Sequence, residues 1–466
     1  MHHNDTICAL STPQGSGAIG VIRISGPEAI NMVHFLFEGR NLEIQKGQSL
    51  HFGKFVDDNE IIDEVLVSLF KAPNSYTGED IVEISCHGSS YILTRVLNAL
   101  INRGARLAKP GEFTMRAFSN GKMDLAQAEA VADLIASESK AAHHLALNQM
   151  RGGFSEKINQ LREELIHFTS LIELELDFSE EDVEFADRDD LKALVNHLIE
   201  VINGLIDSFS TGNALKNGIP VAIIGQPNVG KSTLLNALLN EDKAIVSEIA
   251  GTTRDSIEDE VKIGGVSFRF IDTAGIRETE DIVENIGIKR TYQMLDKATV
   301  ILYLVDIVED SATMISESVL AIQKRIEASD KTLILLANKI DKLQVSEHVI
   351  PKALNDKIPE GIKTIFLSTG QKQNIQGLEA ALKALAEEKL KGANEVLVSN
   401  ARHYEALKKA GEALQRVADG LEQNITGDFL AMDIRQSLFY LGEITGTIEI
   451  DRDILGSIFS KFCIGK

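Results

Sequence analysis

The sequence predicts a multidomain protein of class α/β plus α. The first observation behind this prediction is a glycine-rich loop at 225–232, which separates an apolar run from a helix-like run and is typical of an α/β nucleotide-binding domain. The second is helical periodicity on both sides of that domain, over about 119–215 and 381–466. The third is a mixture of strand and turn patterns in residues 1–118, which predicts an α+β domain.

The composition is typical of a soluble globular chain of several domains. The chain has 466 residues, of which 44% are hydrophobic and 25% charged. Its three cysteines (Cys8, Cys86 and Cys463) are scattered and lack metal-ligand spacing, which indicates a reducing compartment, and we expect the cytoplasm. No signal-peptide pattern or membrane-spanning apolar run is evident. The net charge of −22 argues against a large phosphate-binding face.

The predicted N-terminal domain, 1–118, alternates strands and turns. Its elements are strands at 19–26, 63–70 and 81–85, turns at 73–78 and 109–112, and a helix at 92–101. Two helical segments follow, at 119–215 and 381–466. Because each offers few helices to enclose a core, we expect one helical domain into which a domain at 216–380 is inserted, rather than two separate helical domains.

The loop at 225–232 has the spacing G-x-x-x-x-G-K-S of a P-loop. Its glycines let successive backbone N–H groups approach phosphate oxygens, and the helix N-terminus adds a positive dipole end. Lys231 would reach the outer phosphates and the Ser232 hydroxyl would bind Mg²⁺. The remaining nucleotide contacts expected from this loop are those of Asn228, Val229, Gly230 and Thr233.

Three stretches further along the chain identify the nucleotide as GTP. Asp272, in a stretch with Thr273, Ala274 and Gly275, would hold Mg²⁺ through water. Asp341, which follows Asn338 and Lys339, can accept two hydrogen bonds from guanine that adenine cannot supply. A loop over the base would be formed by Ser368, Thr369 and Gly370. Together these stretches predict a doubly wound, Ras-like P-loop GTPase domain.

The whole chain also resembles the MnmE (TrmE) family of tRNA modification GTPases. The most specific stretches are the N-terminal ones and the ending Cys-Ile-Gly-Lys; the full set is 4–7, 23–26, 76–80, 110–114, 123–130, 251–255 and 462–466. The resemblance implies a folate-binding N-terminal domain that also forms a homodimer, and a helical domain that carries the inserted GTPase.

The family's activity is the modification of C5 of the wobble uridine in certain tRNAs, and the resemblance implies it here. An MnmG (GidA)-type FAD protein would be the partner, in a heterotetramer, and FAD on that partner would handle the redox step. A 5,10-methylene or 5-formyl tetrahydrofolate would supply one carbon, and glycine or ammonium the amine. The product would be a carboxymethylaminomethyl or aminomethyl group. GTP hydrolysis would need Mg²⁺, be stimulated by K⁺ and accompany dimerisation of the GTPase domains.

The resemblance also implies roles for particular residues. Gly275 is followed by Ile276 and not by the glutamine that orients water in Ras-like enzymes, and the family points instead to Glu284. Thr253 would bind Mg²⁺, and K⁺ would be held by Asn228, Ser247, Ile249 and Thr252. The loop around the nucleotide would further include Glu248, Ala250 and Gly251. Folate would be bound by Arg23, Glu83, Lys122 and Lys466, and Cys463 would have a covalent role.

Two other functions stay open from the residues. One is an RNA-binding GTPase that acts as a switch in ribosome assembly, although such proteins are expected to carry a basic domain after the GTPase. The other is a signalling switch that works through protein partners. The bland reading of Arg23 and Lys122 is solvated surface charge, that of Glu83 is the exposed member of a strand, and that of Cys463 is a small buried hydrophobe.

Overall fold

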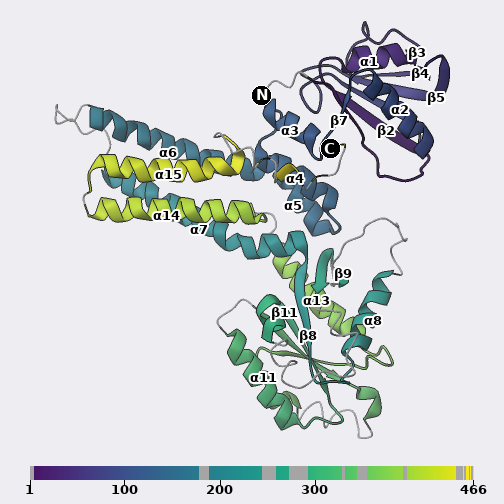
Figure 1. The fold of residues 1–466 in the computed structure, drawn as a ribbon. Coiled ribbons are helices and arrows are strands. Elements are labelled where there is room, and N and C mark those ends of the chain that lie inside the picture. The colour runs from purple at the N-terminus through teal and green to yellow at the C-terminus, as the bar shows by residue number, and fades with distance from the viewer. Residues whose placement is uncertain are drawn as a thin grey trace. The chain divides into compact units, whose positions relative to one another are not determined.

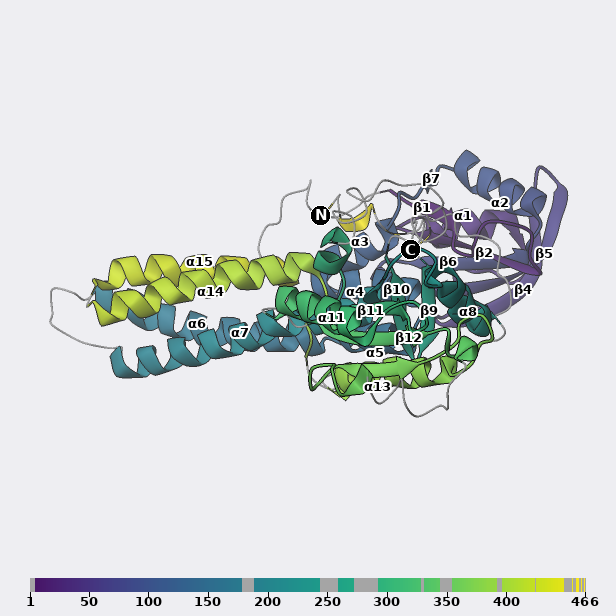
Figure 2. The ribbon, with the colours of Figure 1, turned by 90° about the horizontal axis from the view of Figure 1, so that it is seen from below.

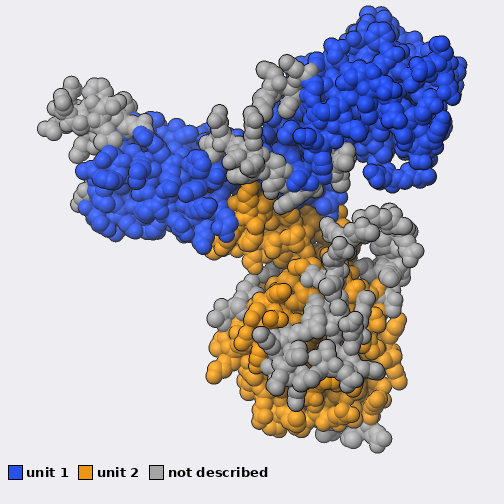
Figure 3. All heavy atoms as spheres, in the orientation of Figure 1, with its two compact units in different colours: residues 1–136, 147–203, 405–466 blue, residues 137–146, 204–404 orange. Residues whose placement is uncertain are grey.

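The computed structural model describes residues 5–177, 188–243, 259–271, 292–327, 331–343, 354–391, 396–423 and 425–447, together with 455, 458–460, 462 and 465. The chain divides into two compact units (Figure 3). Unit 1 contains Met1–Ala136, Leu147–Asn203 and Glu405–Lys466, and unit 2 contains Ser137–Ala146 and Gly204–Tyr404. The predicted multidomain α/β plus α class is confirmed.

The N-terminal part of unit 1 is built on a seven-stranded sheet with the order β3-β4-β5-β6-β2-β1-β7. Neighbouring strands are antiparallel, except that β1 and β7 are parallel. The strands are β1 (Ile7–Leu10), β2 (Ile19–Ser25), β3 (Phe37–Glu38), β4 (Ser49–Asp57), β5 (Glu60–Phe70), β6 (Ile81–His87) and β7 (Arg106–Leu107). The expected α+β pattern of this region is therefore present.

Two helices, α1 (Ala29–Leu36) and α2 (Ser90–Asn102), pack on one face of this sheet (Figure 1). Side chains of a strand alternate between faces, so every second residue of β6 enters the core beneath them, namely Val82, Ile84 and Cys86. Glu83, between two of these, lies on the opposite face. This alternation positions one of the candidate sites described below.

The remainder of unit 1 is helical. Its shorter helices are α3 (Glu112–Ser119) and α4 (Leu125–Ala136), and α5 (Lys140–Met150) is divided between the units. Four long helices run side by side (Figure 1, Figure 2): α6 (Gly153–Asp177), α7 (Arg188–Asn217), α14 (Ala401–Glu422) and α15 (Gly427–Thr445). Residues 204–217 of α7 and 401–404 of α14 belong to unit 2. The apolar stripes predicted from periodicity are buried, including Ile158, Leu165, Val195, Leu198, Leu414 and Ile434. Within the described residues, no helix has both the length and the apolar character needed to cross a membrane.

Unit 2 contains a six-stranded sheet with the order β13-β12-β11-β8-β10-β9, parallel except for β9. The strands are β8 (Ile219–Ile224), β9 (Asp259–Ile263), β10 (Val266–Phe270), β11 (Val300–Asp306), β12 (Thr332–Asn338) and β13 (Lys363–Phe366). Its described helical elements include α8 (Lys231–Lys243), α11 (Ala312–Ile326), α13 (Ile375–Lys391) and the 3₁₀ helix η2 (Ile340–Lys342).

Both faces of this sheet are covered. Val221 and Ile223 of β8 join one core, whereas Ala222 and Ile224 join the other. The next two parallel strands along the chain, β10 and β11, pair with opposite edges of β8. Since the strand order reverses there, the carboxyl end of β8 is a topological switch point, where ligands bind in sheets of this kind.

Segments outside the predicted range 216–380 also belong to unit 2. Leu145 of α5 and Leu215 of α7 lie in the same core as the sheet. Phe209 of α7 stacks on Tyr404, with ring centroids 4.5 Å apart, and the Val398 N–H donates to Ser208 Oγ (3.0 Å). The boundaries at 118, 215 and 380 stay predictions, since compact units and functional domains need not coincide.

Candidate nucleotide-binding site

The P-loop connects β8 to α8 at the switch point of the unit 2 sheet. Two of its glycines make backbone approaches that a side chain would prevent. A Cβ on Gly225 would lie 2.2 Å from the Leu304 carbonyl oxygen, and one on Gly230 would lie 2.6 Å from Asn338 Nδ2. Gly230 also has φ +103, which L-residues rarely adopt. The loop geometry therefore depends on glycine at both positions.

Lys231, the first residue of α8, reaches back over this loop. Its Nζ donates to the carbonyl oxygens of Gly225 (2.9 Å) and Gln226 (2.7 Å). Burial lowers the pKa of Lys231, and among the described residues no carboxylate pairs with it. An ammonium that is partly desolvated and held only by carbonyl dipoles is well suited to bind phosphate oxygens.

Asn338 links the P-loop to the 368–370 loop at the carboxyl edge of the sheet. Its Nδ2 donates to the Val229 carbonyl oxygen (2.6 Å) and lies 3.0 Å from Thr369 Oγ1, while its Oδ1 accepts from the Thr369 N–H (2.9 Å). Asn338 is 1% exposed, so these contacts replace all of its hydration. The residue predicted to be part of the guanine motif therefore also joins the phosphate loop to the 368–370 loop.

Asp341 lies in η2 and is exposed. One of its carboxylate oxygens accepts from Ser368 Oγ (2.5 Å), and the same hydroxyl accepts from the Gln371 N–H (3.2 Å). Ser368 is buried, and its hydroxyl holds one oxygen of the Asp341 carboxylate in place. The Asp341 side chain itself stays accessible to solvent. This orientation leaves acceptor capacity for the two donors on the Watson–Crick edge of guanine.

Twelve of the residues predicted to bind the nucleotide are described by the structure, and they lie at this edge of the sheet. They are Asn228, Val229, Gly230, Lys231, Ser232, Thr233, Asn338, Lys339, Asp341, Ser368, Thr369 and Gly370. The other predicted members lie outside the described residues: Ser247, Glu248, Ile249, Ala250, Gly251, Thr252, Thr253, Asp272, Thr273, Ala274, Gly275 and Glu284.

Two of the predicted metal ligands can be compared with the structure. Ser232 is half-buried in the first turn of α8 beside Lys231, and its hydroxyl is the hard oxygen that Mg²⁺ prefers. Asn228 is exposed in the P-loop and has φ 60. An amide oxygen there suits a weakly bound cation such as K⁺. Both residues therefore fit the predicted ions.

A second candidate site lies in the N-terminal sheet, at Arg23 and Glu83. These two residues are cross-strand partners in β2 and β6, and Arg23 Nε donates to Glu83 Oε1 (2.8 Å). Their side chains are 18% and 25% exposed. The Arg23 guanidinium also lies 5.4 Å from the centroid of the Tyr76 ring and 5.6 Å from that of Phe113. Arg23 is therefore more buried than a solvated surface charge, and Glu83 more buried than the exposed member of a strand.

Lys122 is exposed, but it adjoins the same region. Its Nζ donates to the Pro73 carbonyl oxygen (3.0 Å), in the loop that carries Tyr76. Lys466 and Cys463 lie outside the described residues. The other two cysteines are buried, and burial raises the pKa of Cys8 and of Cys86 to about 11, so neither is a reactive thiolate.

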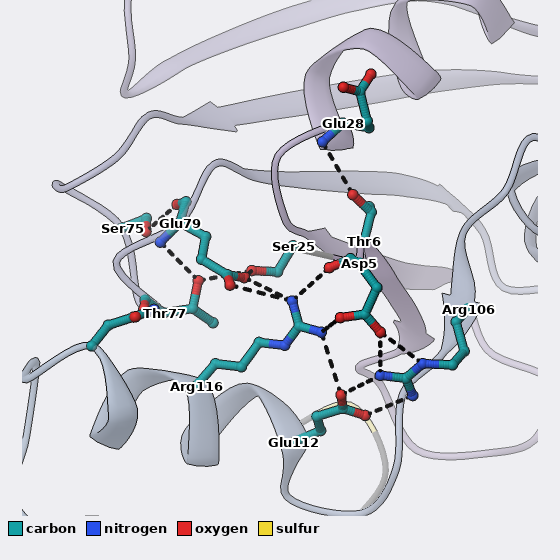
Figure 4. Close-up of polar contacts among 11 residues, drawn as sticks. Asp5, Thr6, Ser25, Glu28, Ser75, Thr77, Glu79, Arg106, Glu112 and Arg116 are labelled. Carbon is teal, nitrogen blue, oxygen red and sulfur yellow. Dashed lines mark hydrogen bonds and ion pairs between the residues drawn. The ribbon is translucent and has the colours of Figure 1, made fainter. Parts of the chain in front are cut away.

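Sequence reasoning missed a buried ion network next to this site (Figure 4). Arg116 of α3 is fully buried and pairs with Asp5 Oδ1 (2.8 Å), Glu79 Oε2 (3.1 Å) and Glu112 Oε1 (3.4 Å). Arg106 pairs with Asp5 and Glu112 from the other side. The network joins the start of the chain, the 73–80 loop and α3. Glu112 and Arg116 are an i,i+4 pair on one helix, but Asp5 and Glu79 are 111 and 37 positions from Arg116, so no local pattern reveals the network as a whole.

Comparisons with known proteins show the family to which the chain belongs. Two family models match the chain, the "GTP-binding protein TrmE N-terminus" over residues 6–122 and the "MnmE helical domain" over residues 125–463. Proteins named "tRNA modification GTPase MnmE" are similar over the full length of both chains. They include proteins of Bacteroides fragilis (55% identity), Bacteroides thetaiotaomicron (54%) and Christiangramia forsetii (54%), each with complete coverage of both sequences. The chain therefore belongs to the MnmE (TrmE) family.

Proposed function

We propose that this protein is a GTPase that acts in the modification of C5 of the wobble uridine of certain tRNAs, in the cytoplasm. The observation that carries the proposal is the joining of P-loop and guanine loop through Asn338, in a chain whose full-length relatives are named tRNA modification GTPases. An MnmG-type FAD protein is the proposed partner, in a heterotetramer. Unit 2 supplies the Ras-like GTPase domain, which the chain inserts into its helical domain.

The proposed roles follow from the chemistry of each group. Lys231 and the N–H groups of the P-loop bind the β- and γ-phosphates, and Ser232 with Thr253 and Asp272 holds Mg²⁺. Asp341 and Asn338 select guanine, with the 368–370 loop over the base. Glu284 positions the attacking water, since isoleucine follows Gly275 where a Ras-like enzyme has glutamine.

K⁺ is the proposed second cation. It would be held by the Asn228 side chain and by oxygens of Ser247, Ile249 and Thr252, and would neutralise charge that develops between the β- and γ-phosphates. The GTPase domains of two copies of the chain would meet when K⁺ and the transition-state charge are present, so that hydrolysis accompanies dimerisation of these domains.

The cation dependence is directly measurable. At equal ionic strength, GTP turnover in KCl should exceed that in NaCl by roughly tenfold or more, because Na⁺ is too small to keep the same oxygen contacts. Asn228→Ala should remove most of this difference and leave the slow Na⁺ rate unchanged. Phosphate release measured in the two salts decides the matter, and equal rates for the unaltered protein would contradict the proposed ion site.

Folate is the proposed one-carbon donor, as a 5,10-methylene or 5-formyl tetrahydrofolate bound in the N-terminal domain. Glu83 suits the amide-like edge of a pterin, and Arg23, Lys122 and Lys466 suit the carboxylates of the glutamate tail. The position of the Arg23–Glu83 pair supports this assignment, because a guanidinium, a carboxylate and the aromatic ring of Tyr76 lie together and remain partly exposed. Cys463 is proposed to have a covalent role in the modification.

Folate binding separates the alternatives for the function. Calorimetry with 5-formyltetrahydrofolate should detect binding to the full chain, and Arg23→Met should raise the Kd about tenfold, since a charged hydrogen bond is lost. Arg95→Met is the matched control, because Arg95 of α2 forms an exposed pair with Glu60, the first residue of β5. Absence of any folate binding would favour the ribosome-assembly switch.

The open face of the N-terminal sheet supports a homodimer through this domain. Phe52 and Leu66 are register partners there, 65% and 41% exposed, and Leu50 beside them is 61% exposed. Clustered apolar side chains on one face are typical of an interaction surface. Ser68, on the same strand as Leu66, pairs in register with Glu83, so this surface is continuous with the proposed folate site.

A further inference from the structure

A buried carboxylate outside every motif lies at the carboxyl edge of the unit 2 sheet, next to the candidate nucleotide-binding residues. Asp306 is the last residue of β11, the strand between β8, which leads into the P-loop, and β12, which leads into the guanine loop. In the parallel register of β11 and β12, it lies beside Asn338. Asp306 is 3% exposed. Aspartate is rarely so buried unless its charge is paired.

Both carboxylate oxygens of Asp306 have a donor. Oδ1 accepts from the Val308 N–H (3.0 Å), and Oδ2 pairs with Lys339 Nζ. Its backbone is fixed as well, because the Asp310 N–H donates to the Asp306 carbonyl oxygen (2.8 Å). Burial alone would raise the pKa of Asp306, but these donors outweigh it and hold the pKa below its ordinary value. Asp306 is thus an immobile, charged anchor for the Lys339 side chain.

Lys339 needs such an anchor. It has φ 68, in the left-handed region that residues with a Cβ adopt at an energetic cost. On one side it follows Asn338, which is bonded to the P-loop, and on the other it begins the η2 turn that presents Asp341. Any change in the Lys339 backbone would therefore move Asp341 relative to the P-loop.

We propose that Asp306 is a positioning residue for guanine recognition: it holds Lys339, and with it the 338–341 segment, so that Asp341 meets the base at a fixed distance from the phosphates. Asp306 acts through Lys339 and does not itself contact the nucleotide. The inference rests on the proposed binding of guanine nucleotides at this site, and it adds a residue that the guanine motif does not contain.

A double-mutant cycle tests this in the full chain, with GDP as the probe in calorimetry. Asp306→Asn should raise the Kd for GDP about tenfold when Lys339 is present, since one charge-assisted contact is lost. In a Lys339→Met background the same change should have less than about a twofold effect, because its target is gone. Asp296→Asn is the matched control, since Asp296 is a carboxylate of the same unit that pairs with Arg325 and not with Lys339. The Kd of this control variant for GDP should stay within about twofold of that of the unaltered protein.

A second readout separates positioning from loss of stability. IDP lacks the 2-amino group of guanine, so the ratio of its Kd to that of GDP reports how well Asp341 faces the base. Asp306→Asn should lower this ratio of Kd values. A loss of folded protein would weaken the binding of GDP and IDP equally and would leave the ratio unchanged. If that variant does not fold, Asp306→Glu keeps the buried charge, displaces it by a methylene, and should give the same pattern.

The inference would be overturned if Asp306→Asn weakened GDP binding equally with Lys339 and with Lys339→Met. It would also be overturned if the ratio of the Kd for IDP to that for GDP did not change. Failure of the unaltered protein to bind GDP would instead overturn the proposed nucleotide site, and this inference with it.

Discussion

Lys231→Ala should lower kcat/KM for GTP hydrolysis by roughly 100- to 1000-fold, the scale on which a charged group that stabilises the transition state acts. In the structure, the Lys231 ammonium bridges the carbonyl oxygens of Gly225 and Gln226 at the mouth of the P-loop. In the GTP complex, phosphate oxygens would take the place of these carbonyl oxygens as partners of the ammonium. Alanine therefore removes the cation that would stabilise the negative charge developing on the phosphates in the transition state. The rate of phosphate release at GTP concentrations well below KM measures kcat/KM directly.

The control for this substitution is Lys363→Ala. Lys363 is the exposed first residue of β13, in the same unit. Its replacement should leave kcat/KM within about twofold, as expected for a surface change remote from the site. Hydrolysis by the Lys231 variant at the rate of the unaltered protein would exclude the P-loop as the site of phosphate chemistry.

Arg116→Met should lower the free energy of unfolding by about 3–5 kcal/mol, the range observed when one partner of a buried ion pair is removed. Methionine fills much of the volume but leaves Glu79 and Glu112 without the cation between them, and Glu112 is 3% exposed. The change should therefore release the start of the chain and the 73–80 loop together. Urea dependence of hydrogen exchange in α3 and β1 provides the measurement.

The same network predicts the direction of the pH dependence. For Asp5 and Glu112, burial acts to raise the pKa, but hydrogen bonds from Arg106 and charge from Arg116 outweigh it, so each pKa lies below its ordinary value of 3.8 or 4.5. A depressed folded-state pKa contributes stability above the ordinary value and loses it as pH falls through the folded value. Stability of this region should hold down to about pH 4.5 and decline below it.

In Arg116→Met this acid dependence should become weaker. Arg95→Met, which removes an exposed pair, should change the free energy of unfolding by less than about 1 kcal/mol. If the Arg116 variant were as stable as the unaltered protein at neutral pH, the network would be dispensable, and its role in holding the 73–80 loop would be excluded.

The parts of the fold that sequence reasoning predicted share a local cause. The strands at 221–224 and 300–305 are short apolar runs bounded by turns, and both are buried strands of the unit 2 sheet. The long helices could be predicted because each buries one stripe of apolar residues, spaced three and four positions apart. β4 went unpredicted because apolar and polar residues occur on both of its faces: His51 is buried whereas Phe52 is exposed.

The site residues that could be predicted are likewise those that belong to local motifs. Lys231, Asn338 and Asp341 belong to motifs whose spacing is fixed by a strand, a loop and a helix start, so a single sequence suffices to find them. Arg116 is 111 positions from Asp5, and nothing in either neighbourhood indicates that they pair. Asp306 ends a readable strand, but only the register of β11 with β12 places it beside the guanine loop.

The most direct test of the account concerns tRNA. It is the mass-spectrometric analysis of wobble uridines from cells whose only copy of this protein carries Lys231→Ala. We expect these uridines to lose the C5 substituent although the protein accumulates at its normal level, while Lys363→Ala cells keep it. Full C5 modification in the Lys231 variant would contradict the claim that GTP hydrolysis at this site drives the modification.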